Sequence, residues 1–333
     1  AFTYYNLNTE MGGTKTLAGT GAITVLNKLR VGNISILNGA DKVLNLCGSG
    51  AIVTLAGKFI PGTSTVNYTS TSNATVAAMN YYILNCSGGP RTLQPDSVIT
   101  IAGTAVNAFT PGTGPFTITR STIKYNGAAA QYIPAFTFNN LTIANTSGDV
   151  STSAPINVQG VLTLEQGILT TTFTNSLTVT NTSVSAVSQG TTTSFVNGPL
   201  KRNLPSNLTG AIDEYIFPVG KATTFLPFTI NTVTTGSNPS LQIEAFLGDC
   251  GGSPNSSPFD ISNTEYWQAT TSNVTSAKVT LTRQTTLGTL NAIGHCSTIN
   301  GTYTSIDGSV FRSYSVKNSN VTTFSFFVLA TRT

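Results

Sequence analysis

Hydrophobic and polar residues alternate over short stretches of this chain, and glycine, asparagine, serine or proline separates one stretch from the next. The alternation is clearest between Ser121 and Gly167, and no helical period fits that region. The alternating runs there are residues 122–125, 136–138, 141–143, 156–158 and 161–164. A period of two is typical of strands that bury one face, so this region predicts a series of short β-strands.

Similar runs are evenly spaced from residue 1 to about residue 196, for example at 23–25, 29–31, 34–37 and 52–55. Even spacing predicts a parallel β-solenoid, in which each coil buries its apolar face against the next coil. The competing interpretation is a β-sandwich built from hairpins. We favour the solenoid because only two obvious hairpin turn pairs occur between residues 1 and 196, Asn38-Gly39 and Asn126-Gly127.

Some of these segments resemble one another. Residues 64–68 resemble residues 121–125, and residues 80–84 resemble residues 137–141. In both cases the two segments are 57 positions apart. Residues 1–7 in turn resemble 135–141. We therefore expect a repeat of this length, with the sequence beginning in the middle of a repeat.

Longer alternating segments follow residue 197, and the only tryptophan, Trp267, lies in one of them. They are 215–220, 225–230, 241–246, 265–268, 277–282 and 322–329. Strands of this number around a tryptophan predict an immunoglobulin-like antiparallel sandwich. The sequence thus predicts an all-β chain with a β-solenoid (parallel β-helix-like) over residues 1–196 and an immunoglobulin-like β-sandwich over 197–333.

Charged residues make up only 8% of the 333 residues, against about a quarter in ordinary soluble domains. Threonine, serine, asparagine and glycine take their place, which is typical of extracellular all-β proteins. The net charge is +4, and the positively charged residues are scattered along the chain, with only Lys201 and Arg202 next to each other. A phosphate-binding surface needs clustered positive charge, so we expect no nucleic-acid partner. No apolar run approaches the roughly 20 residues of a membrane helix, so we expect no membrane insertion.

The four cysteines fall two in each half of the chain. Cys47 and Cys86 have similar contexts, because each lies where a predicted strand gives way to a glycine-rich turn. We expect disulfides Cys47–Cys86 and Cys250–Cys296, although four cysteines permit three connectivities. Four buried free thiols are the alternative.

Several longer runs resemble the large surface proteins that Bacteroidetes bacteria export through the type IX secretion system. These runs are residues 194–202, 217–221, 265–267 and 323–329. The upstream units built on Tyr-Asn-Leu and Val-Leu-Thr-Leu resemble the repeats of the same proteins. The resemblance implies export to the cell surface, a β-rich stalk or adhesin architecture, and a sorting domain beyond residue 333. The motifs that carry it contain no catalytic group.

Carboxylates are the first candidates for catalysis, because glycosidases need a close pair of them and lyases commonly need an acidic cluster for calcium. The acids before residue 197 are Glu10, Asp41, Asp96, Asp149 and Glu165. They share no strand position, so we interpret each as a turn residue or solvated charge. Asp213 and Glu214 form the only adjacent acidic pair, but a strand would send the two side chains to opposite faces.

Other reactive groups are few. The single histidine, His295, has no G-x-S-x-G motif to act with. The chain contains no C-x-x-C spacing of the kind that would indicate a zinc site. We interpret it as a turn residue near a disulfide. We therefore expect no catalytic residue, no cofactor-binding residue and no metal ligand, and we expect that the protein is not an enzyme.

These observations favour a non-enzymatic structural or adhesive protein, extracellular and at the cell surface. An open solenoid end exposes unpaired backbone groups, which a strand from another copy could cover to give a head-to-tail filament. The alternative for this end is the remainder of a longer surface chain.

A second hypothesis is a carbohydrate-binding module that stacks glycans on Tyr81, Tyr82, Tyr132 or Phe138, although we favour core packing for these rings. A third hypothesis is a polysaccharide-degrading β-helix enzyme that uses an acid such as Asp149 or Glu165.

Overall fold

The computed structural model describes residues 1–256, 259–318 and 320–332. It confirms the all-β prediction, because the only helical segment among these residues is the short 3₁₀ turn η1 (Val184–Ala186). The chain divides into two compact units, Ala1–Ala154 and Pro155–Thr333. Each unit is described by itself below.

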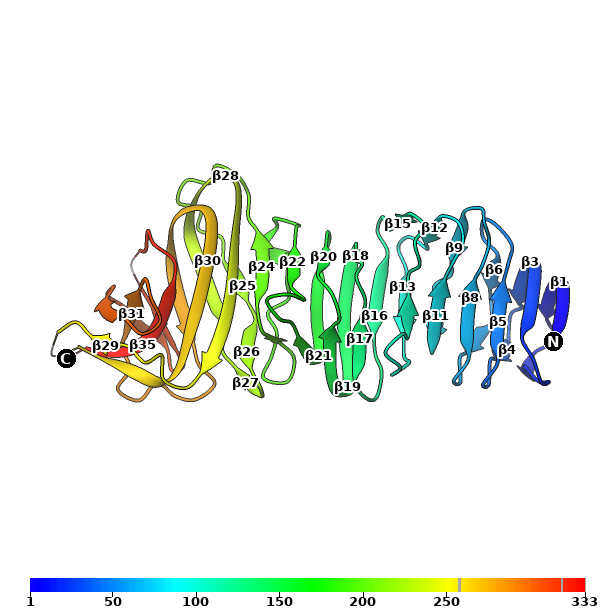
Figure 1. Ribbon diagram of the computed structural model, residues 1–333, viewed down its shortest axis with the longest axis horizontal. Coiled ribbons are helices and arrows are strands. Elements are labelled where there is room, and N and C mark those ends of the chain that lie inside the picture. The colour runs from blue at the N-terminus through cyan, green and yellow to red at the C-terminus, as the bar shows by residue number, and fades with distance from the viewer. Residues whose placement is uncertain (257–258, 319, 333) are drawn as a thin grey trace. The chain divides into compact units, whose positions relative to one another are not determined.

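The first unit is a β-solenoid. Figure 1 shows its strands side by side as successive rungs. One parallel sheet contains, in order, β1 (Phe2–Thr9), β3 (Ile23–Val31), β5 (Val43–Leu46), β8 (Thr65–Tyr68), β11 (Ile83–Cys86) and β14 (Phe109–Thr110). Paired residues such as Phe2 and Ile23, or Thr65 and Ile83, lie one coil apart. The prediction of a parallel solenoid is therefore confirmed.

Further parallel sheets complete the coils of this unit. One contains β2 (Gly13–Thr16), β4 (Ser35–Asn38) and β7 (Lys58–Ile60). Another contains β9 (Ala74–Val76), β12 (Arg91–Leu93) and β15 (Phe116–Thr117). The strands β10 (Asn80–Tyr81), β13 (Val98–Ile101), β16 (Thr122–Tyr125) and β19 (Asn140–Thr152) pair in sequence, and β17 (Gln131–Ile133) also pairs with β19.

The segments that resemble one another in sequence do not mark the coil period. Residues 65–68 form β8, whereas the matching residues 122–125 form β16 in a different sheet. The period of a coil is set instead by pairs such as Thr65 and Ile83. The mismatch has a physical reason, since every face of a solenoid requires the same alternation of buried and outward residues.

Buried and outward positions alternate on each rung. Val66 and Tyr68 on β8 are buried, and Asn67 between them points outward. Asn67 Nδ2 donates to Asn45 Oδ1 at 2.8 Å, and Asn85 Nδ2 donates to Asn67 Oδ1 at 3.0 Å. This asparagine ladder links three consecutive coils through side chains as well as backbone.

The second unit begins with parallel strands and continues with antiparallel ones. Its parallel strands are β20 (Ile156–Val158), β22 (Leu177–Val179) and β24 (Leu200–Asn203), with β21 (Leu162–Thr170), β23 (Val196–Asn197) and β26 (Val219–Lys221) in a second series. The pairing direction changes at β24, which is antiparallel to β28 (Phe228–Leu247). A domain boundary between residues 196 and 197 stays a prediction.

Two long strands dominate the antiparallel part. β28 pairs with β30 (Phe259–Thr282), which also pairs with β35 (Phe326–Arg332). The predicted segment 241–246 and residues 228–230 of the predicted segment 225–230 belong to the single strand β28, whose register shifts between Asn231 and Ser240. Likewise, 265–268 and 277–282 both lie in β30. The immunoglobulin-like sandwich stays a prediction, because the pairing found here is that of long bulged strands.

Trp267 on β30 is fully buried, and its indole Nε1 donates to the backbone oxygen of Leu226 at 2.8 Å. The remaining strands are β6 (Val53–Leu55), β18 (Thr137–Phe138), β25 (Tyr215–Phe217), β27 (Thr224–Phe225), β29 (Ser253–Pro254), β31 (Ala292–Cys296), β32 (Thr302–Ser305), β33 (Ser309–Arg312) and β34 (Ser315–Lys317).

Candidate functional site

All four cysteines are free thiols. Cys47 follows β5 and Cys86 ends β11, and β8 lies between these two strands and pairs with both. Two strand spacings of about 4.8 Å separate the cysteines by more than the roughly 7 Å that a disulfide can bridge between Cα atoms. The predicted disulfide Cys47–Cys86 is therefore wrong. Cys47 Sγ instead contacts the Thr69 hydroxyl at 3.1 Å.

Cys250 and Cys296 lie in one buried cluster with Tyr303, but they too are free thiols. The predicted disulfide Cys250–Cys296 is not present in the structure. For Cys86, burial raises the pKa of the thiol to about 12, so it is not a thiolate at neutral pH. These cysteines pack as small apolar side chains.

Three of the acidic candidates form ion pairs. Glu10 pairs with Arg30 at 3.2 Å, Asp41 with Lys42 at 2.7 Å and Asp96 with Arg120 at 2.6 Å. Solvent screens such exposed pairs, so they contribute little to stability. Asp149 is exposed on β19, and Glu165 is exposed on β21. Within the residues that the structure describes, no group of three or more His, Cys, Asp or Glu side chains could hold a metal ion.

His295 lies within β31 beside a free thiol, so its interpretation as a turn residue near a disulfide is wrong. It has a hydroxyl partner that sequence reasoning did not find. Its Nε2 lies 3.0 Å from Ser325 Oγ, which approaches from the segment before β35. The Ser325 hydroxyl donates its proton to the backbone oxygen of Cys296 at 2.8 Å. Because that proton is engaged, we interpret the pair as a link between β31 and the neighbouring segment. Burial lowers the pKa of His295.

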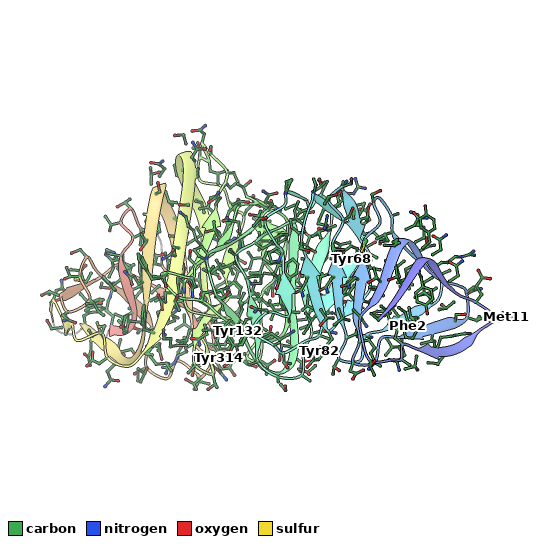
Figure 2. All side chains as sticks on the ribbon, turned by 45° about the vertical axis from the view of Figure 1, so that its right-hand side comes forward. Phe2, Met11, Tyr68, Tyr82, Tyr132 and Tyr314 are labelled. Carbon is green, nitrogen blue, oxygen red and sulfur yellow. The ribbon has the colours of Figure 1, made fainter. Side chains whose placement is uncertain are left out.

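The aromatic residues predicted to stack on glycans divide into two groups. Tyr81 and Phe138 are fully buried, so core packing is the correct interpretation for both. The Tyr81 hydroxyl donates to the backbone oxygen of Ala77 at 2.8 Å and contacts the Tyr68 hydroxyl. Tyr82 and Tyr132, which Figure 2 labels, are half-buried. More exposed aromatic side chains, such as Tyr314, lie elsewhere in the chain.

The second unit contains a groove that combines exposed aromatic, charged and hydroxyl side chains. We call it the Glu214 groove. It consists of two hollows of about 290 and 340 Å³ that share Gln189, Glu214, Ile216 and Thr229. The first hollow is also lined by Pro227, Thr280, Thr282, Phe311, Arg312, Tyr314 and Ser315, and the second by Val184, Ser185, Val187 and Ser188. These volumes lie at the lower end of the range for ligand pockets.

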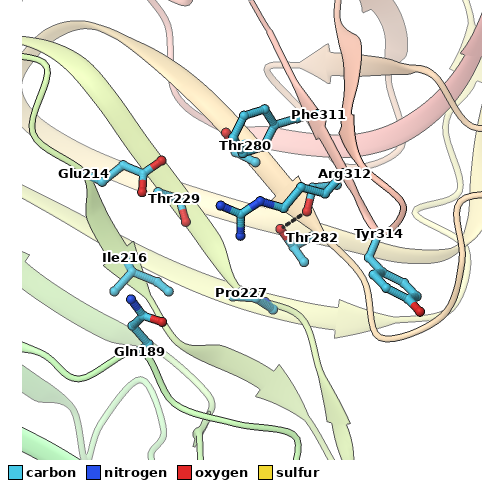
Figure 3. Close-up of a pocket in the computed structure, with 11 residues that line it drawn as sticks. Gln189, Glu214, Ile216, Pro227, Thr229, Thr280, Thr282, Phe311, Arg312 and Tyr314 are labelled. Atoms are coloured by element: carbon cyan, nitrogen blue, oxygen red, sulfur yellow. Dashed lines mark hydrogen bonds between the residues drawn. The ribbon is translucent and has the colours of Figure 1, made fainter.

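Strand pairing places these residues together. Ile216 on β25 pairs with Thr229 on β28, which in turn pairs with Thr280 on β30. Thr282 on β30 pairs with Ser315 on β34, and their hydroxyls are 2.8 Å apart. Successive strands therefore build a floor of hydroxyl groups, which Figure 3 shows between the more exposed side chains.

Arg312 and Glu214 are the charged groups that line the groove, and both are exposed. Figure 3 shows the Arg312 guanidinium pointing across the groove toward the side that carries Glu214. Neither group has an ion-pair partner within the described part of the chain. The guanidinium carbon lies 5.0 Å from the centre of the Phe311 ring, a cation–π contact that helps to orient it.

The sequence analysis considered only one residue of this groove, Glu214, as a candidate for chemistry. Glu214 attracted notice as half of an acidic pair, and it lines the groove without Asp213. Gln189, Arg312 and Tyr314 carried no motif, because they come from loops and strand ends, and Gln189 lies far in the sequence from the other two. Only the pairing of β25, β28, β30 and β34 brings them together.

No protein-family model, curated protein or solved structure matches this chain. No helix among the described residues has the length and apolar character needed to cross a membrane.

Proposed function

We propose that this chain is a non-enzymatic structural and adhesive protein of an extracellular cell surface, and that it attaches to carbohydrate through the Glu214 groove. The observation that carries the proposal is the combination of side chains in that groove. An aromatic ring, Tyr314, is 46% exposed beside a guanidinium, a carboxylate, an amide and a floor of hydroxyls. Sugars present apolar ring faces and many hydroxyls, and both kinds of surface have partners here.

The solenoid supports the structural part of the proposal. Its outward asparagines are bonded to one another between coils, as Asn45, Asn67 and Asn85 show. A scaffold stabilised by uncharged side chains is insensitive to salt, because screening weakens charge pairs and not amide ladders. The resemblance to type IX-secreted surface proteins supports the same setting.

A glycan array tests the proposal directly. The whole chain should bind saccharides, and Tyr314→Ala should weaken binding about tenfold, the effect of losing one stacking contact of about 1.4 kcal/mol. Phe173→Ala is the matched control, because Phe173 is a phenyl ring that is 88% exposed and does not line the groove. Silence across a broad array of saccharides would contradict the proposal.

A second candidate function is assembly into a filament, and β1 favours it. β1 is the end strand of its sheet, and no other described strand pairs with its second edge. Phe2, Tyr4 and Tyr5 on this strand are exposed, and residues 2–9 carry no charge that would oppose strand addition. We propose that a strand of a second copy covers this edge, by β-augmentation.

Electron microscopy of the purified chain at increasing concentration tests this assembly. Filaments with a regular subunit repeat are expected, and Thr3→Pro should abolish them. The Phe2 N–H donates to Ala22 next to β3, so the next N–H along the strand, that of Thr3, faces the open edge, where proline removes a donor. Dispersed particles at every concentration would contradict the filament and leave the groove proposal standing.

A further inference from the structure

We propose that the Glu214 groove selects neutral saccharides of at least two sugar rings. The inference rests on the proposed function and adds the chemical class and size of the ligand. It follows from the charges, the hydroxyls and the division of the groove into two hollows.

The charges of the groove balance. Glu214 and Arg312 are the only charged side chains among its described lining residues, and they have opposite signs. An acidic saccharide would gain a contact with the guanidinium but meet the carboxylate of Glu214, and a cationic saccharide would meet Arg312 with the same difficulty. A neutral sugar meets no like charge, so the lining selects against both charged classes.

The two charged groups complement adjacent sugar hydroxyls. A carboxylate only accepts hydrogen bonds, and a guanidinium only donates them. A sugar hydroxyl does both, so one hydroxyl can donate to Glu214 while its neighbour accepts from Arg312. Since neither group is engaged in an ion pair within the described residues, both are available. The Phe311 ring beside the guanidinium reduces the freedom that Arg312 loses on binding.

The division of the groove sets the minimum length of the ligand. The first hollow contains Arg312, Tyr314 and the hydroxyl floor. The second contains Ser185 and Ser188 beside Val184 and Val187. Gln189 and Glu214 line both hollows, so they lie where one ring of a ligand would follow the next. A single sugar ring would therefore fill only half of the groove.

The test measures binding of the whole chain to two panels of oligosaccharides. The neutral panel contains gluco-, manno- and xylo-oligosaccharides from one to six rings, and the acidic panel contains oligogalacturonates and sulfated oligosaccharides. The chain should bind neutral probes, with an affinity that rises at least tenfold from one ring to two. Arg312→Gln and Glu214→Gln should each weaken neutral binding about tenfold, because each removes a charge-assisted hydrogen bond.

Glu214→Gln gives the most specific readout, because it removes the negative charge and keeps the shape. This variant should gain affinity for oligogalacturonates, whereas Arg312→Gln and the control Phe173→Ala should not. Stronger binding of acidic probes by the unchanged chain, lost in Arg312→Gln, would overturn this inference and support the proposed function. Binding that no groove variant alters would overturn both.

Discussion

Tyr125 and Tyr68 are both fully buried tyrosines of the solenoid, and they differ in what their hydroxyls contact. The Tyr125 hydroxyl has no hydrogen-bond partner among the described residues. The Tyr68 hydroxyl accepts from the backbone N–H of Ala77 at 3.0 Å and contacts the Tyr81 hydroxyl at 2.9 Å. Burial therefore has a different energetic consequence at each position.

The pair Tyr125→Phe and Tyr68→Phe tests this difference. We expect Tyr125→Phe to leave the unfolding free energy unchanged or raised, because it removes an unsatisfied polar atom. Tyr68→Phe should lower it by about 1–3 kcal/mol, since the Ala77 N–H loses its acceptor. Urea unfolding of both variants measures the effect, and equal losses would contradict the assignment.

Arg91 is a buried cation that backbone oxygens surround. Its Nη2 donates to the oxygens of Tyr68 at 2.8 Å and Ser70 at 3.0 Å, and its Nη1 donates to those of Gly89 and Pro90. These carbonyls belong to turns of successive coils, so one side chain satisfies several turns at once.

We expect Arg91→Met to lower the unfolding free energy by about 2–4 kcal/mol, because the buried carbonyls lose their donors. Arg30→Met is the control in the same unit, since the exposed Arg30–Glu10 pair contributes at most about 1 kcal/mol. Urea denaturation compares the two variants. A loss at Arg91 no larger than the loss at Arg30 would show that the carbonyls find other partners.

Close stacking of the coils depends on glycine at particular turns. A methyl group added at Gly103 would overlap the backbone oxygen of Tyr82 on the neighbouring coil. At Gly236 the nearest atom, Asn273 Cβ, would lie at an ordinary 3.6 Å. Neither glycine has a positive φ, so the two positions differ in space alone.

Gly103→Ala should therefore destabilise the first unit by about 1–3 kcal/mol, because the coils must separate to admit the methyl group. Gly236→Ala should have little effect or a small favourable one. Thermal melts followed by circular dichroism measure both. An unchanged melting temperature for Gly103→Ala would contradict the close coil contact.

The strands show how far the alternation pattern predicts structure. It located β16, β20 and β6 almost to the residue, because one-sided burial requires a period of two. It divided β28 into shorter strands, because the polar residues at 231–240 resemble a loop and yet pair through register shifts. It divided β30 in the same way, at the largely polar residues 270–276. It also placed Cys47 near Cys86, since similar contexts do not reveal that β8 lies between them.

The groove shows why a site is harder to predict than a strand. Alternation is a local property, whereas Gln189, Glu214 and Arg312 meet only through the order of β25, β28, β30 and β34. Glu214 was noticed for its neighbour Asp213, which does not line the groove. No spacing along the chain could have indicated the other members.

Buried tyrosines dominate the response of the protein's stability to alkaline pH. Burial raises the pKa of Tyr68, Tyr81, Tyr125 and Tyr303 above 10. The unfolded chain releases these protons near pH 10, whereas the folded chain keeps them. The free energy of unfolding is therefore unaffected by these tyrosines below about pH 10 and falls as the pH rises above it. Burial lowers the pKa of Arg91 and that of Arg202, the latter to about 10, so these two groups act oppositely. The raised groups outnumber them, because burial also raises the pKa of the Cys86 thiol.

We therefore expect the urea midpoint to fall as the pH rises from about 9 to 11. The same titration of Tyr125→Phe should show a smaller fall, because one raised pKa is removed. A midpoint that rises over this range would mean that Arg91 and Arg202 outweigh the tyrosines.

Hydrogen exchange in the presence of neutral oligosaccharides locates the binding site, so it shows whether the Glu214 groove binds them. With cellohexaose, mannohexaose or xylohexaose as the probe, we expect protection at residues 184–189, 214–216 and 311–315, and no change at β8, which carries Asn67 of the asparagine ladder. Protection confined to other segments, or none with any of the three probes, would contradict the assignment of the Glu214 groove as the adhesive site.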